Sequence, residues 1–257
     1  MQLRHFDSDG VDIAFIDEGE GDPVLLIHGF ASNIEVNWVG TGWVSALRRA
    51  GHRVVALDNR GHGHSEKIYD PAAYAASDMA EDARRLLDHL GIERSAVMGY
   101  SMGARITAFL AIRHPGRVER AVFGGLGINM VRGVGDPAPI VAALEAGSLE
   151  EVPDPVGRTF RSFAEQTGSD LRALAACMRS SRPRISPELL GSLAMPVLVV
   201  VGSADEVGGD PHLLAELIPN GRALSLPGRD HMKAVGDRQF KEAVIAFLSE
   251  AGLGEGG

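Results

Sequence analysis

A serine between glycines is the pattern in this chain that most directly indicates covalent chemistry. Residues 99–103 have the sequence Gly-Tyr-Ser-Met-Gly, with Ser101 at the centre. The motif follows an apolar run typical of a strand (96–98) and opens a segment typical of a helix (102–114), the context that gives a G-x-S-x-G match meaning. The sharp turn strains the serine backbone, and glycines give it room. The alternative is a surface serine in a glycine-rich turn. A nucleophilic Ser101 needs a neighbouring base, because a serine hydroxyl is a weak nucleophile at neutral pH.

Two further motifs precede this one in the chain. Residues 24–30 have the sequence Val-Leu-Leu-Ile-His-Gly-Phe, and residues 57–65 have the sequence Leu-Asp-Asn-Arg-Gly-His-Gly-His-Ser. With residues 98–103 they resemble, in the same order, the oxyanion loop, the D-x-R-G-x-G-x-S loop and the nucleophile elbow of the α/β-hydrolase superfamily. The resemblance is to its serine hydrolases, in the branch of esterases and enol-lactonases, and covers nearly the whole chain. One departure is Ala104, where many relatives have a second glycine, and we expect little effect from it.

The resemblance implies a general base near the end of the chain, after the last strand. Residues 222–226 have the pattern of that strand, and His231 follows it closely. His62 and His64 are weaker alternatives, because they belong to the loop after an early strand. His28 precedes the oxyanion loop, where a role in shaping that loop is the better interpretation. The predicted base is therefore His231.

The base needs a buried carboxylate that fixes its tautomer and stabilises the imidazolium. The resemblance places this acid directly after the predicted strand 197–201, where Asp205 lies. Glu206 and Asp210 are close enough in sequence to replace it in principle. Some relatives carry the acid after the preceding strand instead, but residues 122–127 contain no acid. Asp205 is therefore the predicted acid, and the order Ser, Asp, His is that of the superfamily.

The resemblance also implies two backbone donors for the developing oxyanion. Met102, the residue after the nucleophile, supplies one N–H group, and Phe30, after the His-Gly pair, supplies the other. Both are main-chain roles, and losing one such donor lowers the rate by about 10²–10³. The side chains that bind the substrate are not identified by the sequence.

The elements that must position these residues follow the rhythm of an α/β fold. Short apolar runs without alternation are typical of strands covered on both faces, as in a parallel sheet. They occupy residues 24–27, 54–57, 96–98, 121–123 and 197–201. Helical segments lie between several of them, which predicts right-handed crossovers and helices on both faces of a mostly parallel central sheet. Residues 11–17 alternate as a strand does, and residues 2–6 are their candidate hairpin partner.

Three helices have clear boundaries in the sequence. Asp70 and Pro71 are a candidate N-cap and first residue for a helix that ends before Gly91. The helix over 102–114 ends at a proline, and residues 240–248 form the expected last helix.

Residues 128–193 interrupt the rhythm. They contain no convincing strand, but they have helical patches at 140–144 and 171–178. We expect a small helical cap there, inserted into a core formed by residues 1–127 and 194–257.

Composition excludes several other classes. The chain of 257 residues is 45% hydrophobic and 23% charged, which is ordinary for a globular domain that needs no metal or disulfide to form a core. Its net charge of −9 disfavours nucleic acid and anionic membrane surfaces as partners. The longest apolar run, 196–201, is too short to span a bilayer, and no signal peptide is visible, so a cytoplasmic location is the default expectation. Cys177 is the single cysteine and is interpreted as a small apolar residue.

The expected reaction is hydrolysis of a small-molecule carboxylic ester, with an aliphatic preference, through an acyl-serine intermediate. The sequence has no H-E-x-x-H motif, no closely spaced Cys/His set and no G-x-G-x-x-G that opens a strand–helix unit. A metal or cofactor is therefore not implied. Serine at position 101 disfavours dehalogenase and epoxide hydrolase chemistry, which uses aspartate there. A lactonase or carbon–carbon bond hydrolase is the alternative, with Arg179, Arg182 and Arg184 either binding a substrate carboxylate or forming a solvated edge. Haloperoxidase-like side activity and a non-catalytic receptor also stay open. The oligomeric state is not predicted.

Overall fold

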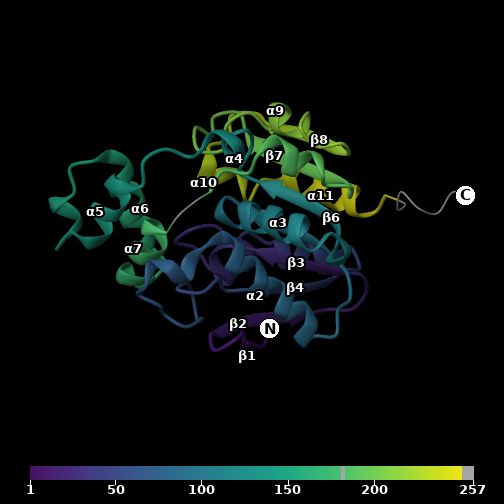
Figure 1. Ribbon diagram of the computed structural model, residues 1–257, viewed down its shortest axis with the longest axis horizontal. Helices are drawn as coiled ribbons and strands as arrows, with labels where there is room; N and C mark the ends of the chain where they lie inside the picture. The colour runs from purple at the N-terminus through teal and green to yellow at the C-terminus, as the bar shows by residue number, and fades with distance from the viewer. Residues whose placement is uncertain (181–182, 251–257) are drawn as a thin grey trace, which may run out of the picture.

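Eight strands form one sheet in the computed structural model, which describes residues 1–180 and 183–250 (Figure 1). Their order across the sheet is β1-β2-β4-β3-β5-β6-β7-β8. The hairpin β1–β2 and the pair β2–β4 are antiparallel, and every other neighbouring pair is parallel. The strands are β1 (Arg4–Asp7), β2 (Asp12–Glu18), β3 (Pro23–Ile27), β4 (Arg53–Leu57), β5 (Ser95–Tyr100), β6 (Val118–Gly124), β7 (Val197–Gly202) and β8 (Gly221–Leu226).

The central strands are covered on both faces, which explains their continuous apolar sequences. Every residue of β5 and β7 is buried. Helices α2 (Ala76–His89), α3 (Met102–Arg113) and α9 (Pro211–Ala215) contribute apolar side chains to the core on one face, and α1 (Trp43–Arg49) and α11 (Arg238–Leu248) contribute to the core on the other face. The predicted fold class, a mostly parallel sheet between helical layers, is confirmed, and so is the N-terminal hairpin.

The helices differ widely in length. They are α1 (Trp43–Arg49), α2 (Ala76–His89), α3 (Met102–Arg113), α4 (Asn129–Arg132), α5 (Ala138–Glu145), α6 (Pro155–Gln166), α7 (Leu171–Arg179), α8 (Pro187–Gly191), α9 (Pro211–Ala215), α10 (His231–Ala234) and α11 (Arg238–Leu248). A π-helical turn, η1 (Glu35–Val39), and three 3₁₀ turns, η2 (Pro71–Tyr74), η3 (Pro115–Arg117) and η4 (Leu149–Glu151), complete the set. None of the helices within the described ranges is long and apolar enough to cross a membrane.

The predicted start of α2 is wrong. Asp70 and Pro71 open the short turn η2 instead, where the Asp70 carboxylate accepts the Ala72 N–H. The extended residue Ala75, with φ −59° and ψ 132°, then separates η2 from α2. The interruption has a packing reason, because η2 buries the ring of Tyr74 against the core before the longer helix begins. The predicted end before Gly91 is correct.

The segment between β6 and β7 consists of helices joined by loops, with no strand among its described residues. Helices α5, α6 and α7 stand together at the left of Figure 1, to one side of the sheet. The patches predicted at 140–144 and 171–178 lie in α5 and α7, whereas α6 was not predicted. We call residues 128–193 the cap and the rest of the chain the core, and this division stays a prediction.

Candidate active site

Ser101 lies at the sharp turn between β5 and α3, where its backbone has φ 56° and ψ −112°. This is a strained conformation for a residue with a side chain. The turn requires glycine on both sides of Ser101, because backbone atoms lie where the Cβ atom of any other residue would be. A Cβ atom on Gly103 would lie 1.9 Å from the Ile27 carbonyl oxygen, and one on Gly99 would lie 2.0 Å from the Gly103 carbonyl oxygen. The strained turn expected from the motif is therefore present.

The structure brings Ser101, His231 and Asp205 together, although they are far apart in sequence. The Nε2 atom of His231 lies 3.0 Å from Ser101 Oγ, and its Nδ1 atom lies 2.7 Å from Asp205 Oδ2. The other carboxylate oxygen of Asp205 accepts the N–H groups of Val207 at 2.9 Å and Gly208 at 2.8 Å. Because the Asp205 carboxylate is buried and held at both oxygens, it fixes the orientation of the imidazole ring.

The alternative residues have other contacts. The carboxylate of Asp210 accepts the His212 N–H at the start of α9, and Glu206 is exposed. The ring of His62 is buried, with Nδ1 2.9 Å from the Arg60 carbonyl oxygen, and the backbone of His64 donates to Asp58. Across the described ranges, no hydrogen bond joins any of these candidates to Ser101.

The loop that carries His231 is held by side chains that the sequence analysis did not identify. Tyr100 donates its hydroxyl hydrogen to the His231 carbonyl oxygen at 2.5 Å, and Trp43 Nε1 donates to the Val235 carbonyl oxygen at 2.6 Å. Burial raises the pKa of Tyr100 well above its usual value, so the hydroxyl stays protonated as a donor. The only available signal was the position of Tyr100 beside Ser101 in the motif.

His28 holds the backbone of the loop that follows β3. Its Nε2 atom accepts the Asn59 N–H at 2.9 Å, so Nδ1 carries the ring proton and donates to the Gly29 carbonyl oxygen at 2.7 Å. Burial lowers the pKa of His28 to about 4, which keeps the ring neutral near pH 7. Because a trans peptide directs its C=O and N–H groups in opposite directions, this bond also sets the direction of the Phe30 N–H.

Phe30 and Met102, the predicted oxyanion donors, both lie next to Ser101. Phe30 lines the cavities beside Ser101, and Met102 is the first residue of α3. Their roles as backbone donors stay predictions.

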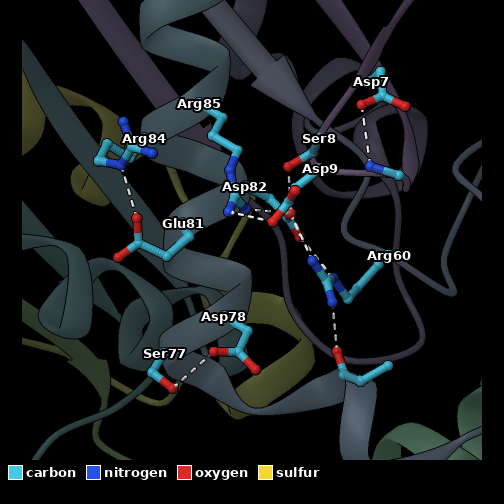
Figure 2. Close-up of polar contacts among 12 residues, drawn as sticks. Asp7, Ser8, Asp9, Arg60, Ser77, Asp78, Glu81, Asp82, Arg84 and Arg85 are labelled. Atoms are coloured by element: carbon cyan, nitrogen blue, oxygen red, sulfur yellow. Dashed lines mark hydrogen bonds and ion pairs between the residues drawn. The ribbon is translucent and has the colours of Figure 1, made fainter.

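The loop after β4 is anchored by a buried ion pair, shown in Figure 2. Arg60 donates from Nε to Asp82 Oδ2 at 2.8 Å and from Nη2 to Asp82 Oδ1 at 2.7 Å. Ser8, in the turn of the β1–β2 hairpin, donates to the same carboxylate at 2.6 Å. The pair joins the hairpin, α2 and this loop, and so supports Asn59, whose N–H holds His28.

Two pockets flank Ser101. The first, which we call the His231 pocket, is lined by Gly29, Phe30, Ser32, Val36, Asn37, Thr41, Tyr100, Ser101, Phe160, Phe163, His231, Met232 and Val235. The second, the Met102 pocket, is lined by Phe30, Tyr74, Ala76, Met79, Ser101, Met102, Arg105, Leu126, 134–137, Ile140, Val156, Phe160, Cys177, Met178 and Val207. Including their open mouths, they enclose about 650 Å³ and about 980 Å³.

Of the cap arginines considered as carboxylate ligands, the two that the structure describes, Arg179 and Arg184, line neither pocket. Arg179 is exposed and pairs with Glu145 at 2.6 Å, and Arg184 is exposed beside Gly133. Arg182 lies outside the described residues. This arrangement favours the solvated edge for Arg179 and Arg184. Among the side chains that the structure describes, no group of three His, Cys, Asp or Glu residues could hold a metal ion.

Comparison with known proteins gives the family. A model of the family described as "alpha/beta hydrolase fold" matches residues 22–160. A 2-hydroxymuconate semialdehyde hydrolase of Pseudomonas putida is 40% identical over 129 residues, which are 50% of this chain and 42% of that protein. A non-heme chloroperoxidase, CPO-A1, of Kitasatospora aureofaciens is 29% identical over 94% of this chain and 98% of that protein.

A solved structure extends the likeness to the whole fold. The crystal structure of a hydrolase from Pseudomonas aeruginosa PA01 matches with a TM-score of 0.80 and 26% identity, over 96% of this chain and 98% of that one. Since the family model covers more than half of the sequence, the chain belongs to the α/β-hydrolase family.

Proposed function

We propose that this protein is a serine hydrolase that cleaves carboxylic esters through an acyl intermediate on Ser101. One observation carries the proposal: the imidazole of His231 contacts Ser101 Oγ through one nitrogen, at 3.0 Å, and Asp205 through the other, at 2.7 Å. A base within hydrogen-bond reach of a hydroxyl, oriented by a buried carboxylate, is the arrangement that activates a serine nucleophile.

Acylation begins when Ser101 Oγ attacks the ester carbonyl carbon and His231 Nε2 takes the hydroxyl proton. The carbonyl oxygen becomes an oxyanion, which the N–H groups of Phe30 and Met102 stabilise. The bond from carbon to the alcohol oxygen then breaks, and His231 gives its proton to that oxygen. Asp205 stabilises the imidazolium while it exists. The alcohol leaves, and the acyl group stays on Ser101.

Deacylation repeats these steps with water in place of serine. His231 takes a proton from the water molecule as its oxygen attacks the acyl carbon. The bond to Ser101 Oγ then breaks, the proton returns to Oγ, and the carboxylic acid leaves. Ser101 and His231 are then back in their starting protonation states, and the steps use no cofactor.

The experiment is hydrolysis of a series of p-nitrophenyl esters, from acetate to long acyl chains, by the wild type and by Ser101→Ala. We expect kcat to fall by a factor on the order of 10⁶ in the variant, as in comparable triads. Ser192→Ala, an exposed serine at the end of α8, is the matched control and should keep wild-type rates. Ester turnover that survives in Ser101→Ala would contradict the proposal.

Cleavage of a carbon–carbon bond or a lactone is the second candidate. Its support is the 40% identity over half of this chain to a protein named 2-hydroxymuconate semialdehyde hydrolase. Steady turnover of a lactone or a vinylogous diketone, with no turnover of open esters by the folded wild type, would favour it. A receptor would instead be labelled once at Ser101 without turnover of any of these compounds.

A further inference from the structure

The two pockets beside Ser101 differ in the catalytic group that lines them. His231 lines the first pocket and is absent from the walls of the Met102 pocket. Met102, whose N–H faces the oxyanion in the proposed mechanism, lines the second of the two pockets and not the first. Ser101, Phe30 and Phe160 belong to both, so the reacting carbon lies where the pockets meet.

Proton delivery decides how an ester must lie across this junction. The imidazole of His231 gives its proton to the departing alcohol oxygen, so that oxygen must lie on the His231 side of the reacting carbon. The acyl chain, bonded to the same carbon, must then point away from His231. We therefore propose, resting on the acyl-serine mechanism above, that the Met102 pocket binds the acyl chain and the His231 pocket binds the alcohol.

The walls of the Met102 pocket define the class of acyl group. Its interior is apolar and rich in sulfur, with the buried side chains of Met79, Cys177 and Met178. Thioether side chains are flexible and adapt to chains of different shapes. Arg105 also lines this pocket, and its Nη1 atom donates to the carbonyl oxygens of Met130 at 3.2 Å and Pro183 at 3.0 Å. Asp136 lies at the exposed mouth. The acyl group is therefore an uncharged aliphatic chain that is longer than acetyl.

The His231 pocket has a different character. Buried Ser32 and Asn37, together with half-buried Thr41, place hydroxyl and amide groups along its wall. These groups suit an alcohol that itself carries hydrogen-bonding groups.

The test uses two matched substitutions that each fill one pocket. Ile140 lines only the Met102 pocket and Val36 lines only the His231 pocket, and both are half-buried aliphatic residues. In Ile140→Phe, kcat/KM for the longest accepted acyl chain should fall at least tenfold relative to acetate, while the order of preference among alcohols stays unchanged. In Val36→Phe, the alcohol preference should change by a similar factor and the acyl preference should not. Rates come from acid release with a pH indicator, so that non-chromogenic alcohols can be compared.

Ile140→Ala keeps the test decisive if a larger side chain prevents folding. It should gain activity on longer acyl chains without a change in alcohol preference. A reversed pattern, or both preferences changing in each variant, would overturn the pocket assignment while leaving the proposed function intact. If the wild type hydrolyses no ester, the proposed function fails first and the assignment fails with it.

A second feature links the cap to the backbone that follows Phe30. Ala31 is completely buried and has a φ of 58°, a strained conformation for a residue other than glycine. Thr167, at the end of α6 in the cap, donates from Oγ1 to the Ala31 carbonyl oxygen at 3.0 Å. The ring of Phe160, also on α6, lies 5.9 Å from the ring of Phe30. The cap therefore contacts the loop at two successive residues.

Thr167 Oγ1 also lies 3.0 Å from the Ala164 carbonyl oxygen, within its own helix. That oxygen already accepts the Ser169 N–H at 2.9 Å, and the Ser169 hydroxyl lies 2.8 Å from Thr167 Oγ1. From the core side, His28 holds the Gly29 carbonyl oxygen. We infer that Thr167 is a positioning residue: it holds Ala31 from the cap side, as His28 holds Gly29, and so fixes the N–H of Phe30 between them.

The test removes one hydroxyl and keeps the shape of the side chain. In Thr167→Val, kcat should fall about tenfold with KM unchanged, because a displaced oxyanion donor weakens only the transition state. Affinity for a trifluoromethyl ketone, which forms the tetrahedral adduct, should fall by the same factor. Thr167→Ser should restore both values, and Ser169→Ala should leave them near those of the wild type. An unchanged kcat in Thr167→Val, or a rise in KM alone, would overturn the inference.

Discussion

The core and the cap contribute to the site in different ways. The proposed catalytic groups belong to the core, where Ser101, Asp205 and His231 follow β5, β7 and β8 and are held by backbone and buried side chains. The cap contributes mostly walls, such as Phe160 and Ile140, together with the hydrogen bond from Thr167 to the loop after β3. Because the proposed catalytic residues lie in the core and many of the pocket walls lie in the cap, the reaction and the choice of substrate can change independently. We therefore expect substitutions at the proposed triad to change kcat and substitutions in the cap walls to change substrate affinity, whereas Thr167, which holds the loop after β3, is the cap residue whose loss should change kcat.

After Ser101, the largest effect is expected from Asp205, the proposed acid of the core. Asp205→Asn keeps the shape of the side chain but removes the charge that stabilises the imidazolium and fixes its tautomer. We expect kcat for p-nitrophenyl esters to fall about 10⁴-fold. Asp210→Asn, at the N-cap of α9, is the control and should stay within a few-fold of the wild type. Equal losses in the two variants would argue against a specific role for Asp205.

The next effect is a loss of stability when a Cβ atom is added to a glycine that packs against backbone, and it should be absent at a glycine with free space around it. Gly103→Ala places a Cβ atom 1.9 Å from the Ile27 carbonyl oxygen, so β3 or the turn at Ser101 must move. We expect the free energy of unfolding in urea to fall by about 3 kcal/mol, with loss of activity. Gly116→Ala meets no atom within 4 Å and should be nearly neutral. A Gly103→Ala protein as stable as the wild type would contradict the close packing of this turn.

The buried histidines of the core predict a loss of stability in acid. Burial lowers the pKa of His28 to about 4 and that of His62 to about 3, whereas both bind a proton near pH 6.5 in the unfolded chain. Below pH 6.5 the unfolded state therefore takes up protons that the folded state refuses, and the free energy of unfolding falls as the pH drops toward 4. The loss should reach about 3 kcal/mol per histidine at most. Urea unfolding at pH 7 and pH 4.5 measures it.

His28→Asn supplies the control for that prediction, because it removes one of the two buried rings. Its stability should depend less steeply on pH between 6.5 and 4.5 than that of the wild type. An identical slope in both proteins would show that other groups cause the acid sensitivity.

The smallest effect is expected from the cap. The buried guanidinium of Arg161 donates to the carbonyl oxygens of Ala143 at 2.8 Å and Ala146 at 2.9 Å, and so ties α6 to the end of α5. Arg161→Met should loosen these walls and raise KM about fivefold, roughly 1 kcal/mol, while kcat stays near the wild-type value. A large fall in kcat without a change in KM would show that the contact between α5 and α6 supports the chemistry and not the walls that bind the substrate.

The core could be predicted from the sequence more fully than the cap. The core strands were predictable because burial on both faces leaves continuous apolar runs, and the turn at Ser101 was predictable because glycines mark it. Helix α6 was missed because apolar side chains such as Phe160 and Phe163 are few among its polar neighbours. The start of α2 was misplaced because Asp70 and Pro71 open a 3₁₀ turn as readily as an α-helix.

Contacts between distant residues left no pattern in the sequence. Tyr100 and His231 are 131 residues apart, and Thr167 and Ala31 are 136 residues apart. Neither bond changes local hydrophobic periodicity, so only the folded chain shows which backbone groups these side chains hold. The resemblance to a family could indicate the residues of the triad, but not the side chains that position them here.

The most direct test of the account is to trap the acyl group. The wild type and Ser101→Ala would be mixed with a slowly deacylating p-nitrophenyl ester, quenched in acid within the first turnover, and digested for mass spectrometry. The proposed mechanism requires one acyl group on the peptide that contains Ser101, formed at the rate of the p-nitrophenol burst and absent from the variant. An acyl group on another residue such as Cys177, or ester turnover with no acylated peptide, would contradict it.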